Sequence, residues 1–373
     1  MVISTYNALW KSNFTTSKQR LTMTQMSNLR IKSEKDVISP HQLQKEIPST
    51  EPARLTVSKA RNELVNILEG RNQRVVVMVG PCSIHDVDAA LEYAGRLRKL
   101  ADFVKDTTLI VMRVYFEKPR TTTGWKGLIV DPHRDGSNDF NEGLRIARKL
   151  LVTVSEMGLP IVTEFLGPIV PQFIGDLITT GTVGARTIES QTHREMASGL
   201  SMPIGYKNDT HGETKNALDA YVASCAEHTF LGIDEVGQLK LLETTGNPHG
   251  YIILRGGNGV TNYDPAKVDA VIADITKRNL KCPIVVDCSH GNSEKKAQNQ
   301  DAAFKSVSRQ IVAGKRQVIG MMVESNLLPG RQDYVKGRPL EYGVSITDEC
   351  IGWAQTEVMI ITQHLLFLNQ RRA

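Results

Sequence analysis

Eight short apolar runs recur along the sequence, and a longer stretch of helical character separates each run from the next. The runs are Val75–Val79, Leu109–Val114, Pro160–Phe165, Thr182–Ala185, Pro203–Tyr206, Tyr251–Leu254, Pro283–Val286 and Val318–Val323. Strands that alternate with helices form βαβ units, and the strands of such units are parallel. Eight of them favour a sheet that closes on itself over an open sheet. The sequence therefore predicts an α/β fold, a (β/α)8 TIM barrel.

Two further segments stand out from this rhythm. Thr229–Asp234 and Gln238–Glu243 flank the turn sequence Glu235-Val236-Gly237 ahead of the sixth run, which predicts an inserted β-hairpin before strand six. Ser58–Glu69 carries apolar residues on one helical face and is followed by Gly70, so it predicts a helix before the first strand.

The first fifty residues show little periodicity apart from His41–Ile47. We expect residues 1–50 to form a partly disordered N-terminal extension and residues 51–373 to form a single barrel domain. The segment up to Lys32 has five basic residues and no acidic one. It is either a targeting segment or a tail ahead of a later start codon, and the missing arginine-rich amphipathic repeat favours the tail.

Composition narrows the class of protein. The chain has 373 residues, of which 40% are hydrophobic, and its net charge of +5 is not gathered into a basic block, so we expect no nucleic-acid partner. No apolar run approaches the length of a membrane span. The five cysteines are odd in number, widely spaced and form no CxxC pair, which indicates a reducing compartment, the cytoplasm.

Basic side chains follow most of the predicted strands. Because the carboxyl ends of barrel strands meet at one face, these side chains are expected to share a rim. They are Arg113, Lys118, Arg120, Arg186, Lys207 and Arg255. Like charges at close range repel unless anions lie between them, and guanidinium groups match carboxylate and phosphate oxygens. The pattern predicts a site for two small, multiply charged anions.

Four potential metal ligands follow the first, seventh and eighth strands, which are neighbours in a closed barrel. They are Cys82, His290, Glu324 and Asp348. A thiolate, an imidazole and two carboxylates suit a first-row transition metal, and Mn²⁺, Fe²⁺, Co²⁺ and Zn²⁺ all accept such ligands. We expect one divalent ion here, with its identity open.

Several long strings resemble the type I 3-deoxy-D-arabino-heptulosonate-7-phosphate (DAHP) synthases, and the similarity runs from about Arg30 to the C-terminus. The strings are Gly80-Pro81-Cys82-Ser83-Ile84-His85-Asp86, Glu117-Lys118-Pro119-Arg120-Thr121-Thr122, Gly124-Trp125-Lys126-Gly127-Leu128, Gly184-Ala185-Arg186-Thr187 and Ser345-Ile346-Thr347-Asp348. The resemblance implies a metal-dependent condensation of phosphoenolpyruvate with erythrose 4-phosphate, the first step of the shikimate pathway.

The resemblance also implies roles for individual residues. The metal would be held by Cys82, His290, Glu324 and Asp348, and phosphoenolpyruvate would be bound by Arg113, Arg186, Lys207 and Arg255. Erythrose 4-phosphate would be bound by Lys118, Arg120 and Thr121. Lys118, Glu164 and His290 would be the catalytic residues, with Glu164 near the attacking water.

Many members of this family are inhibited by an aromatic amino acid, and the resemblance implies an effector pocket. Its expected residues are Pro168, Gln172, Leu200, Ser201, Phe230 and Gly232. Gly232 stands where phenylalanine-sensitive members carry serine, so the space it leaves favours tyrosine as the effector. The family also implies a homodimer or homotetramer, with the N-terminal extension crossing between subunits.

Two alternatives stay open at this stage. One is a synthase that uses another aldose phosphate, such as arabinose 5-phosphate, although the Lys118–Thr122 string argues for erythrose 4-phosphate. The other is a catalytically inactive aromatic amino-acid sensor on the same barrel, although the complete set of metal ligands argues against it.

Overall fold

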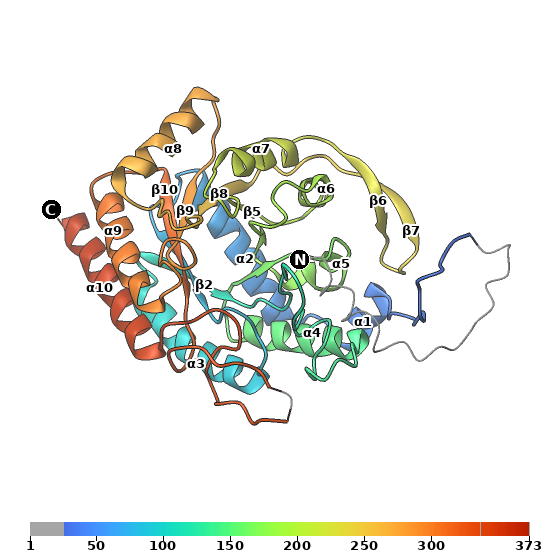
Figure 1. Cartoon of the computed structure of the whole chain (residues 1–373). Helices are drawn as coiled ribbons and strands as arrows, with labels where there is room; N and C mark the ends of the chain where they lie inside the picture. The colour runs from blue at the N-terminus through green and yellow to red at the C-terminus, as the bar shows by residue number, and fades with distance from the viewer. Residues whose placement is uncertain (1–25, 336, 373) are drawn as a thin grey trace, which may run out of the picture. The chain divides into compact units, whose positions relative to one another are not determined.

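The computed structural model describes residues 26–335 and 337–372, so the predicted targeting segment or tail lies largely outside the described residues. Eight parallel strands close into a barrel in the order β1-β10-β9-β8-β5-β4-β3-β2, which confirms the predicted fold (Figure 1). Their bounds are β1 Val75–Gly80, β2 Thr108–Arg113, β3 Ile161–Glu164, β4 Thr180–Val183, β5 Ile204–Lys207, β8 Gly250–Leu254, β9 Ile284–Asp287 and β10 Val318–Glu324.

One strand lies earlier than the apolar pattern predicts. The fourth run was placed at Thr182–Ala185, but β4 spans Thr180–Val183. Its two threonine hydroxyls are satisfied inside the barrel: Thr180 Oγ1 donates to the Pro203 carbonyl at 2.7 Å, and Thr182 Oγ1 lies 3.2 Å from the Tyr115 hydroxyl. Polar residues with such partners can be buried in a strand. A prediction that places strands at runs of apolar residues therefore does not detect them.

Helices surround the barrel on its outer side (Figure 1). They are α3 Val87–Val104, α4 Phe140–Glu156, α5 Pro171–Ile174, α6 Gln191–Ser198, α7 Lys215–Ser224, α8 Pro265–Lys277, α9 Gln300–Val312 and α10 Trp353–Arg372, with short 3₁₀ turns η1 Gly175–Leu177 and η2 Ala297–Asn299. Aspartates begin three of the longer ones: the side chains of Asp86, Asp139 and Asp264 each accept a backbone N–H of the first helical turn.

Helix α2 covers the end of the barrel where the strands begin. It spans Glu51–Leu68, seven residues longer at its start than predicted, because Thr50 caps it and Pro52 occupies its first turn. Leu64 and Ile67 of α2 join the core cluster that fills the barrel interior, together with Val76, Met78 and Ile253. The chain divides into two units at Val37 and Ile38, and the barrel, α2 and the short helix α1 Pro40–Glu46 belong to the second.

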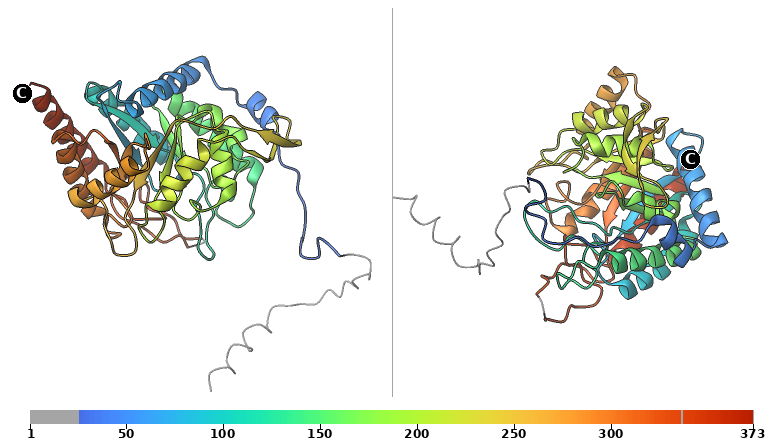
Figure 2. Two further views of the ribbon diagram at one scale, coloured as in Figure 1. Left: turned by 90° about the horizontal axis from the view of Figure 1, so that it is seen from above. Right: turned by 90° about the vertical axis from the view of Figure 1, so that its right-hand side faces the viewer.

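The predicted hairpin is present before the sixth barrel strand. Strands β6 Thr229–Ile233 and β7 Leu239–Glu243 pair antiparallel as a separate two-stranded sheet. Asp234 shapes the turn, because its Oδ1 accepts the Val236 and Gln238 N–H groups at 3.1 and 2.9 Å. The turn contacts the start of α1, where the His41 N–H donates to the Glu235 carbonyl at 2.7 Å; Figure 2 shows the hairpin beside this helix.

Among the described residues, the helices include none with both the length and the apolar character needed to cross a lipid bilayer.

Candidate active site

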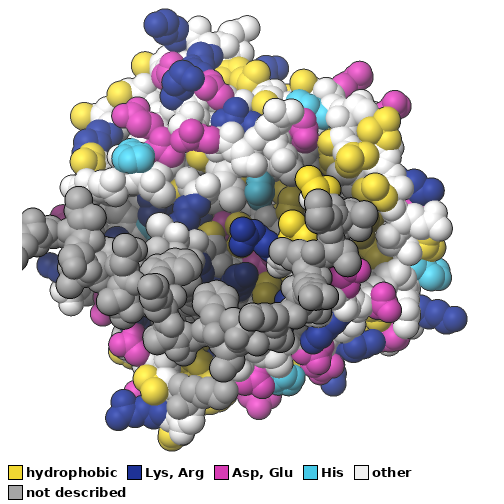
Figure 3. Space-filling model, turned by 45° about the vertical axis from the view of Figure 1, so that its right-hand side comes forward, with side chains coloured by type: hydrophobic (Ala, Val, Ile, Leu, Met, Phe, Trp, Pro, Cys, Tyr) yellow, Lys and Arg dark blue, Asp and Glu magenta, His cyan; other side chains and the backbone are white. Residues whose placement is uncertain are grey.

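A polar cavity that eight of the predicted site residues share lies at the carboxyl ends of the strands and has a volume of about 590 Å³. Its wall is made by the last residues of β3 and β10 and by the loops that follow β2, β4, β8, β9 and β10. The predicted site residues in the wall are Lys118, Arg120, Glu164, Arg186, Arg255, His290, Glu324 and Asp348. Figure 3 shows Lys and Arg side chains gathered in a hollow of the face drawn there. The structure thus brings residues up to 230 positions apart into one polar site.

Three of the four predicted metal ligands lie together beside this cavity. Ligand atoms of Cys82, Glu324 and Asp348 are all within 4.8 Å of one another, and Cys82 Sγ is 3.6 Å from Asp348 Oδ2. The fourth, His290, has its Nε2 3.7 Å from Glu324 Oε1. One sulfur, one imidazole nitrogen and two carboxylates at these separations fit a single divalent transition-metal ion.

The charges around Cys82 support the same interpretation. Burial, together with the nearby carboxylates of Glu324 and Asp348, raises the pKa of the Cys82 thiol to about 12, although the charge of Lys118 acts against the rise. Lys118 Nζ lies 3.2 Å from Cys82 Sγ and 3.0 Å from the Cys82 carbonyl oxygen. A buried thiol facing two carboxylates becomes a thiolate only beside a strong positive charge, and a divalent cation supplies one.

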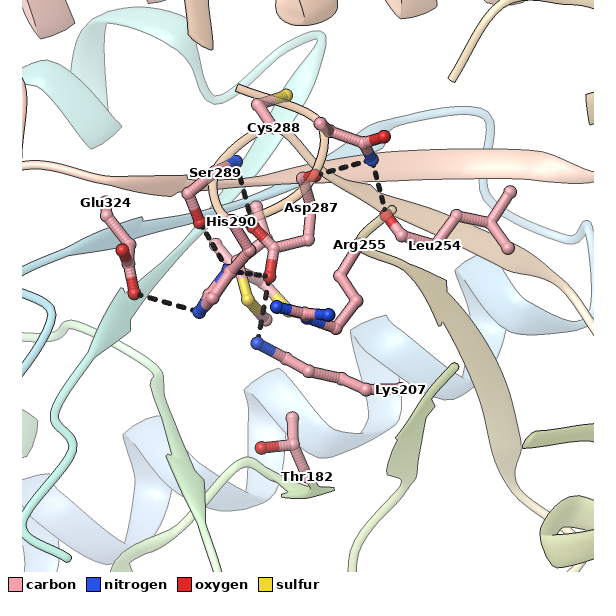
Figure 4. A network of polar contacts seen from close by, with 12 residues as sticks. Thr182, Lys207, Leu254, Arg255, Asp287, Cys288, Ser289, His290 and Glu324 are labelled. Carbon is pink, nitrogen blue, oxygen red and sulfur yellow. Dashed lines mark hydrogen bonds and ion pairs between the residues drawn. The ribbon is translucent and has the colours of Figure 1, made fainter. Parts of the chain in front are cut away.

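Asp287, at the end of β9, is the centre of a buried polar network (Figure 4). Its Oδ2 accepts from Lys207 Nζ at 2.8 Å and lies 3.0 Å from His290 Nδ1. Its Oδ1 accepts from the N–H and hydroxyl of Ser289 at 3.0 and 2.5 Å. Burial opposes ionisation, but Lys207 and His290 outweigh it and hold the pKa of this carboxyl well below its usual range. Asp287 therefore fixes the imidazole so that Nε2 faces Glu324.

Asp287 is a functional residue that the sequence pattern did not single out. The available signal was a carboxylate that ends an otherwise apolar strand, three residues before a predicted metal ligand. His290 itself has a φ of +58°, a left-handed conformation that a non-glycine residue adopts only when its surroundings hold it there.

Arg113 lies inside the barrel, apart from the residues that line the cavity. Its side chain is 1% exposed, NH2 is 3.1 Å from Glu324 Oε1, and the guanidinium carbon lies 4.0 Å from the centre of the Tyr115 ring. Its Nε is buried and has no hydrogen-bond partner. Lys207 and Thr121 are also absent from the residues that line the cavity wall. The side chain of Lys207 is paired with Asp287 instead. The predicted role of these three residues in binding substrate stays a prediction.

Glu164 ends β3 and is one of the residues that line the cavity. Its Oε1 is buried and has no hydrogen-bond partner, and a Cβ added at Gly184 would lie 2.1 Å from this oxygen. Glu117 lies nearby and accepts the Gly167 N–H at 3.2 Å; burial raises the pKa of Glu117 to about 7, and the charge of Glu164 adds to the effect. The sequence analysis assigned no role to Glu117.

The predicted effector residues lie in three separate parts of the chain. Leu200 and Ser201 line a second cavity of about 590 Å³ beside α2, with Arg54 and Arg61, whereas the other four do not line it. Gln172 is on α5, and Pro168 lies in the loop before it. Phe230 and Gly232 are on β6, where a Cβ added at Gly232 would lie 2.5 Å from Leu242 Cδ1. The effector assignment stays a prediction.

The fold and the site together define a (β/α)8-barrel protein whose polar centre, with a potential metal site, lies at the carboxyl ends of the strands. Residues 43–360 match the family model described as the DAHP synthetase I family, and the chain belongs to this family.

Two relatives and one solved structure show how close the similarity is. The chain is 49% identical over 340 residues to the Tyr-sensitive phospho-2-dehydro-3-deoxyheptonate aldolase of Salmonella typhimurium, which covers 91% of this chain and 95% of that one. It is 49% identical over 336 residues to the Phe-sensitive enzyme of Escherichia coli, covering 90% and 96%. The structure of the Francisella tularensis aldolase aligns with a TM-score of 0.87 at 45% identity, covering 90% and 97%.

Proposed function

We propose that this chain is a DAHP synthase, which condenses phosphoenolpyruvate with erythrose 4-phosphate and water to give DAHP and phosphate, the first step of the shikimate pathway. The observation that carries the proposal is the meeting of Cys82, His290, Glu324 and Asp348 beside a cavity lined with basic side chains. Membership of the family and relatives named for this activity support it.

The cations of the cavity bind and orient the two anions. Arg186 and Arg255 lie in the wall and are suited to the phosphate and carboxylate of phosphoenolpyruvate, whose phosphate later departs. Lys118 and Arg120 come from the loop after β2 and are suited to erythrose 4-phosphate. In the proposed reaction these cations hold the two substrates side by side before any bond forms.

The reaction needs one carbon–carbon bond, one water and one departing phosphate. C3 of phosphoenolpyruvate attacks the aldehyde carbon, water adds at C2, and the C2–O bond to phosphate then breaks. A divalent ion held by Cys82, His290, Glu324 and Asp348 would supply Lewis-acid polarisation of the aldehyde. Glu164, with its free buried oxygen, accepts a hydrogen bond from the water, and Lys118 donates a proton to the aldehyde oxygen, which becomes the new hydroxyl.

A Schiff-base route through Lys207 is disfavoured by the structure. Its Nζ is 2.8 Å from Asp287 Oδ2, and although burial acts against the charged form, this ion pair raises the pKa of Lys207 above its usual range. A permanently protonated amine is not a nucleophile.

The test is consumption of phosphoenolpyruvate in the presence of erythrose 4-phosphate, before and after EDTA and after adding back Mn²⁺. We expect EDTA to abolish activity and Mn²⁺ to restore it, and arabinose 5-phosphate to be a poor replacement. His290→Gln should be inactive, whereas His228→Gln, which alters a histidine bonded to the Ala223 carbonyl outside the cavity, should be active. No turnover, or activity that survives EDTA, would overturn the proposal; no turnover would favour an inactive sensor.

For regulation we propose feedback inhibition by an aromatic amino acid, with tyrosine favoured because Gly232 bears no side chain. Relatives named Tyr-sensitive and Phe-sensitive are equally identical to this chain, so overall identity leaves the effector open. Titrating the enzyme with each aromatic amino acid tests the choice, and inhibition by phenylalanine but not by tyrosine would contradict it.

We also propose a cytoplasmic homodimer or homotetramer in which residues 51–373 form the catalytic domain and residues 1–50 reach a neighbouring subunit. Three leucines on one face of the hairpin support a subunit contact: Leu231, Leu239 and Leu241 are 69%, 71% and 65% exposed in the single chain. All five cysteines are free, in keeping with a reducing compartment. Light scattering of the purified protein would measure the oligomeric state.

A further inference from the structure

Arg134 lies where three loops of the active-site face meet. These are the β1–α3 loop (residues 81–86), the β2–α4 loop (residues 114–139) and the β10–α10 loop (residues 325–352). The first and third carry metal ligands, Cys82 and Asp348, and the second carries Lys118 and Arg120. Arg134 belongs to the second loop and is bonded to the other two.

The side chain of Arg134 is hydrogen-bonded to the β1–α3 loop. Arg134 NH1 donates a short hydrogen bond to the carbonyl oxygen of His85, three residues after Cys82. His85 is 7% exposed, so this contact lies in the interior of the loop cluster. Arg134 Nε is buried and has no hydrogen-bond partner. A guanidinium group is seldom left partly unsatisfied in a protein interior unless its remaining contacts hold it in place.

The backbone carbonyl and the guanidinium group of Arg134 both contact Tyr334 in the β10–α10 loop. The Tyr334 hydroxyl donates to the Arg134 carbonyl at 2.5 Å, and the guanidinium carbon lies 5.9 Å from the centre of the Tyr334 ring. Arg134 has a φ of +57°, which a side-chain-bearing residue adopts only under constraint. Both tyrosine contacts act on this strained residue and hold it in place.

A chain of hydrogen bonds runs from Arg134 to Arg120. The Arg134 N–H donates to the Asp131 carbonyl at 3.3 Å, and the same carbonyl accepts from Trp125 Nε1 at 2.8 Å. The Trp125 carbonyl in turn accepts from Arg120 Nε at 2.8 Å. Arg120 lines the cavity, so a shift of Arg134 is transmitted to a substrate cation through two carbonyl oxygens.

The residues proposed for phosphoenolpyruvate depend on other contacts. Lys207 is held by Asp287 on β9, and Arg255 NH1 donates to the Gly256 carbonyl at 3.2 Å. Neither contact involves the β2–α4 loop. The β1–α3 and β10–α10 loops have a tie of their own, a 2.8 Å hydrogen bond between the Ser83 and Thr347 hydroxyls. The start of the β2–α4 loop is tied to the β1–α3 loop independently of Arg134, since the Ile84 N–H donates to the Tyr115 carbonyl at 2.9 Å and Lys118 Nζ donates to the Cys82 carbonyl at 3.0 Å. Loss of Arg134 therefore leaves these loops joined and loosens mainly the part of the β2–α4 loop beyond Lys118, which carries Arg120.

We infer that Arg134 and Tyr334 form a strut that positions the β2–α4 loop, and with it Arg120, for the aldose phosphate. Arg134 is a positioning residue and does not itself line the cavity. The inference rests on the proposed condensation, because it assigns Arg120 to one of the two substrates of that reaction.

The test compares Arg134→Met, Tyr334→Phe and the double variant with the wild-type holoenzyme loaded with Mn²⁺. We expect Arg134→Met to raise KM for erythrose 4-phosphate about tenfold, because small displacements of a binding group weaken it strongly, and to leave KM for phosphoenolpyruvate within about twofold. Tyr334→Phe should give a smaller rise, and the double variant should resemble Arg134→Met, since both act on one contact. Arg134→Lys should recover part of the loss.

Two further measurements keep the outcomes separate. Arg98→Met is the matched control, since Arg98 NH1 donates to the Gly158 carbonyl at 2.8 Å before β3, at the opposite end of the barrel, and both KM values should be unchanged. Hydrogen exchange of residues 118–134 should be faster in Arg134→Met than in wild type, whether or not the enzyme turns over. An inactive wild-type enzyme would refute the proposed condensation. The positioning role of Arg134 would then be tested by hydrogen exchange alone. Equal KM values and equal exchange in an active Arg134→Met would overturn the strut.

Discussion

The two ends of the barrel are built from the same eight strands and differ in what they bury. At the end covered by α2, Leu64 and Ile67 pack with valine and methionine side chains into a closed apolar cluster. At the carboxyl ends, the interior holds Asp287, Lys207, Arg113 and Glu324 as paired charges, and two buried polar atoms, Glu164 Oε1 and Arg113 Nε, have no partner. One end stabilises the fold, while the other carries charges whose burial is costly and which serve the chemistry.

The largest effect is expected at the charged end, for Asp287→Asn. The substitution leaves Lys207 buried without its counter-charge and frees His290, so the free energy of unfolding should fall by about 3–5 kcal/mol. The value of kcat/KM should fall about 10–100-fold, as expected for a residue that orients a proposed metal ligand. Chemical denaturation and steady-state kinetics measure the two quantities.

The matched control is Asp219→Asn, since Asp219 also pairs with two cations, Lys215 and Arg278, on the outer surface. Exposed pairs contribute about 1 kcal/mol or less, so its stability and activity should be close to wild type. If Asp287→Asn behaved like this control, the contrast between the two ends would be wrong.

The next largest effect is expected at the apolar end, for Leu64→Ala. Leu64 is fully buried, and removing its side chain should cost about 2–5 kcal/mol of unfolding free energy. Because the cavity lies at the other end, kcat/KM measured well below the melting temperature should be unchanged. Leu55→Ala in the same helix, where the leucine is 63% exposed, should cost less than about 0.5 kcal/mol. A large loss of activity in folded Leu64→Ala would show that the two ends are coupled.

The smallest effect is expected for Gly184→Ala, which tests the role of Glu164 at the charged end of the barrel. The new Cβ would lie 2.1 Å from Glu164 Oε1, and the flexible carboxylate would move away at little cost in stability. The value of kcat should therefore fall about tenfold, since a misplaced group loses much of its effect. Gly95→Ala in α3 meets open space and should raise stability by about 0.5–1 kcal/mol with unchanged kcat. Unchanged kcat in Gly184→Ala would remove Glu164 from the mechanism.

Much of the fold was predictable because its signals are local. Apolar runs, their spacing and the turn residues predict eight strands and a hairpin, and barrel topology then brings strand ends together. This is why Cys82, His290, Glu324 and Asp348 could be grouped from the sequence. β4 was displaced by two residues because its threonines are satisfied by the Pro203 carbonyl and the Tyr115 hydroxyl, partners that no local pattern reveals.

The rest of the site depended on side-chain directions. Arg113 ends strand β2 and Arg120 lies in the loop after it, yet Arg113 turns inward to Glu324, and Arg120 reaches the cavity wall. Asp287 is the shared partner of Lys207 and His290 only because β5 and β9 flank β8. Arg134 acts across three loops, and nothing in its own neighbourhood along the chain distinguishes it from a surface arginine.

The sequence by itself determined the barrel and the end at which the polar residues gather, and it proposed a set of metal ligands there, because strand alternation and strand-end position are periodic properties of the chain. Only the tertiary structure decided which charges pair, which face the cavity and which loops are tied together. Those choices depend on distances of a few ångströms between residues far apart in sequence, where hydrogen bonding and burial, rather than periodicity, set the free energy.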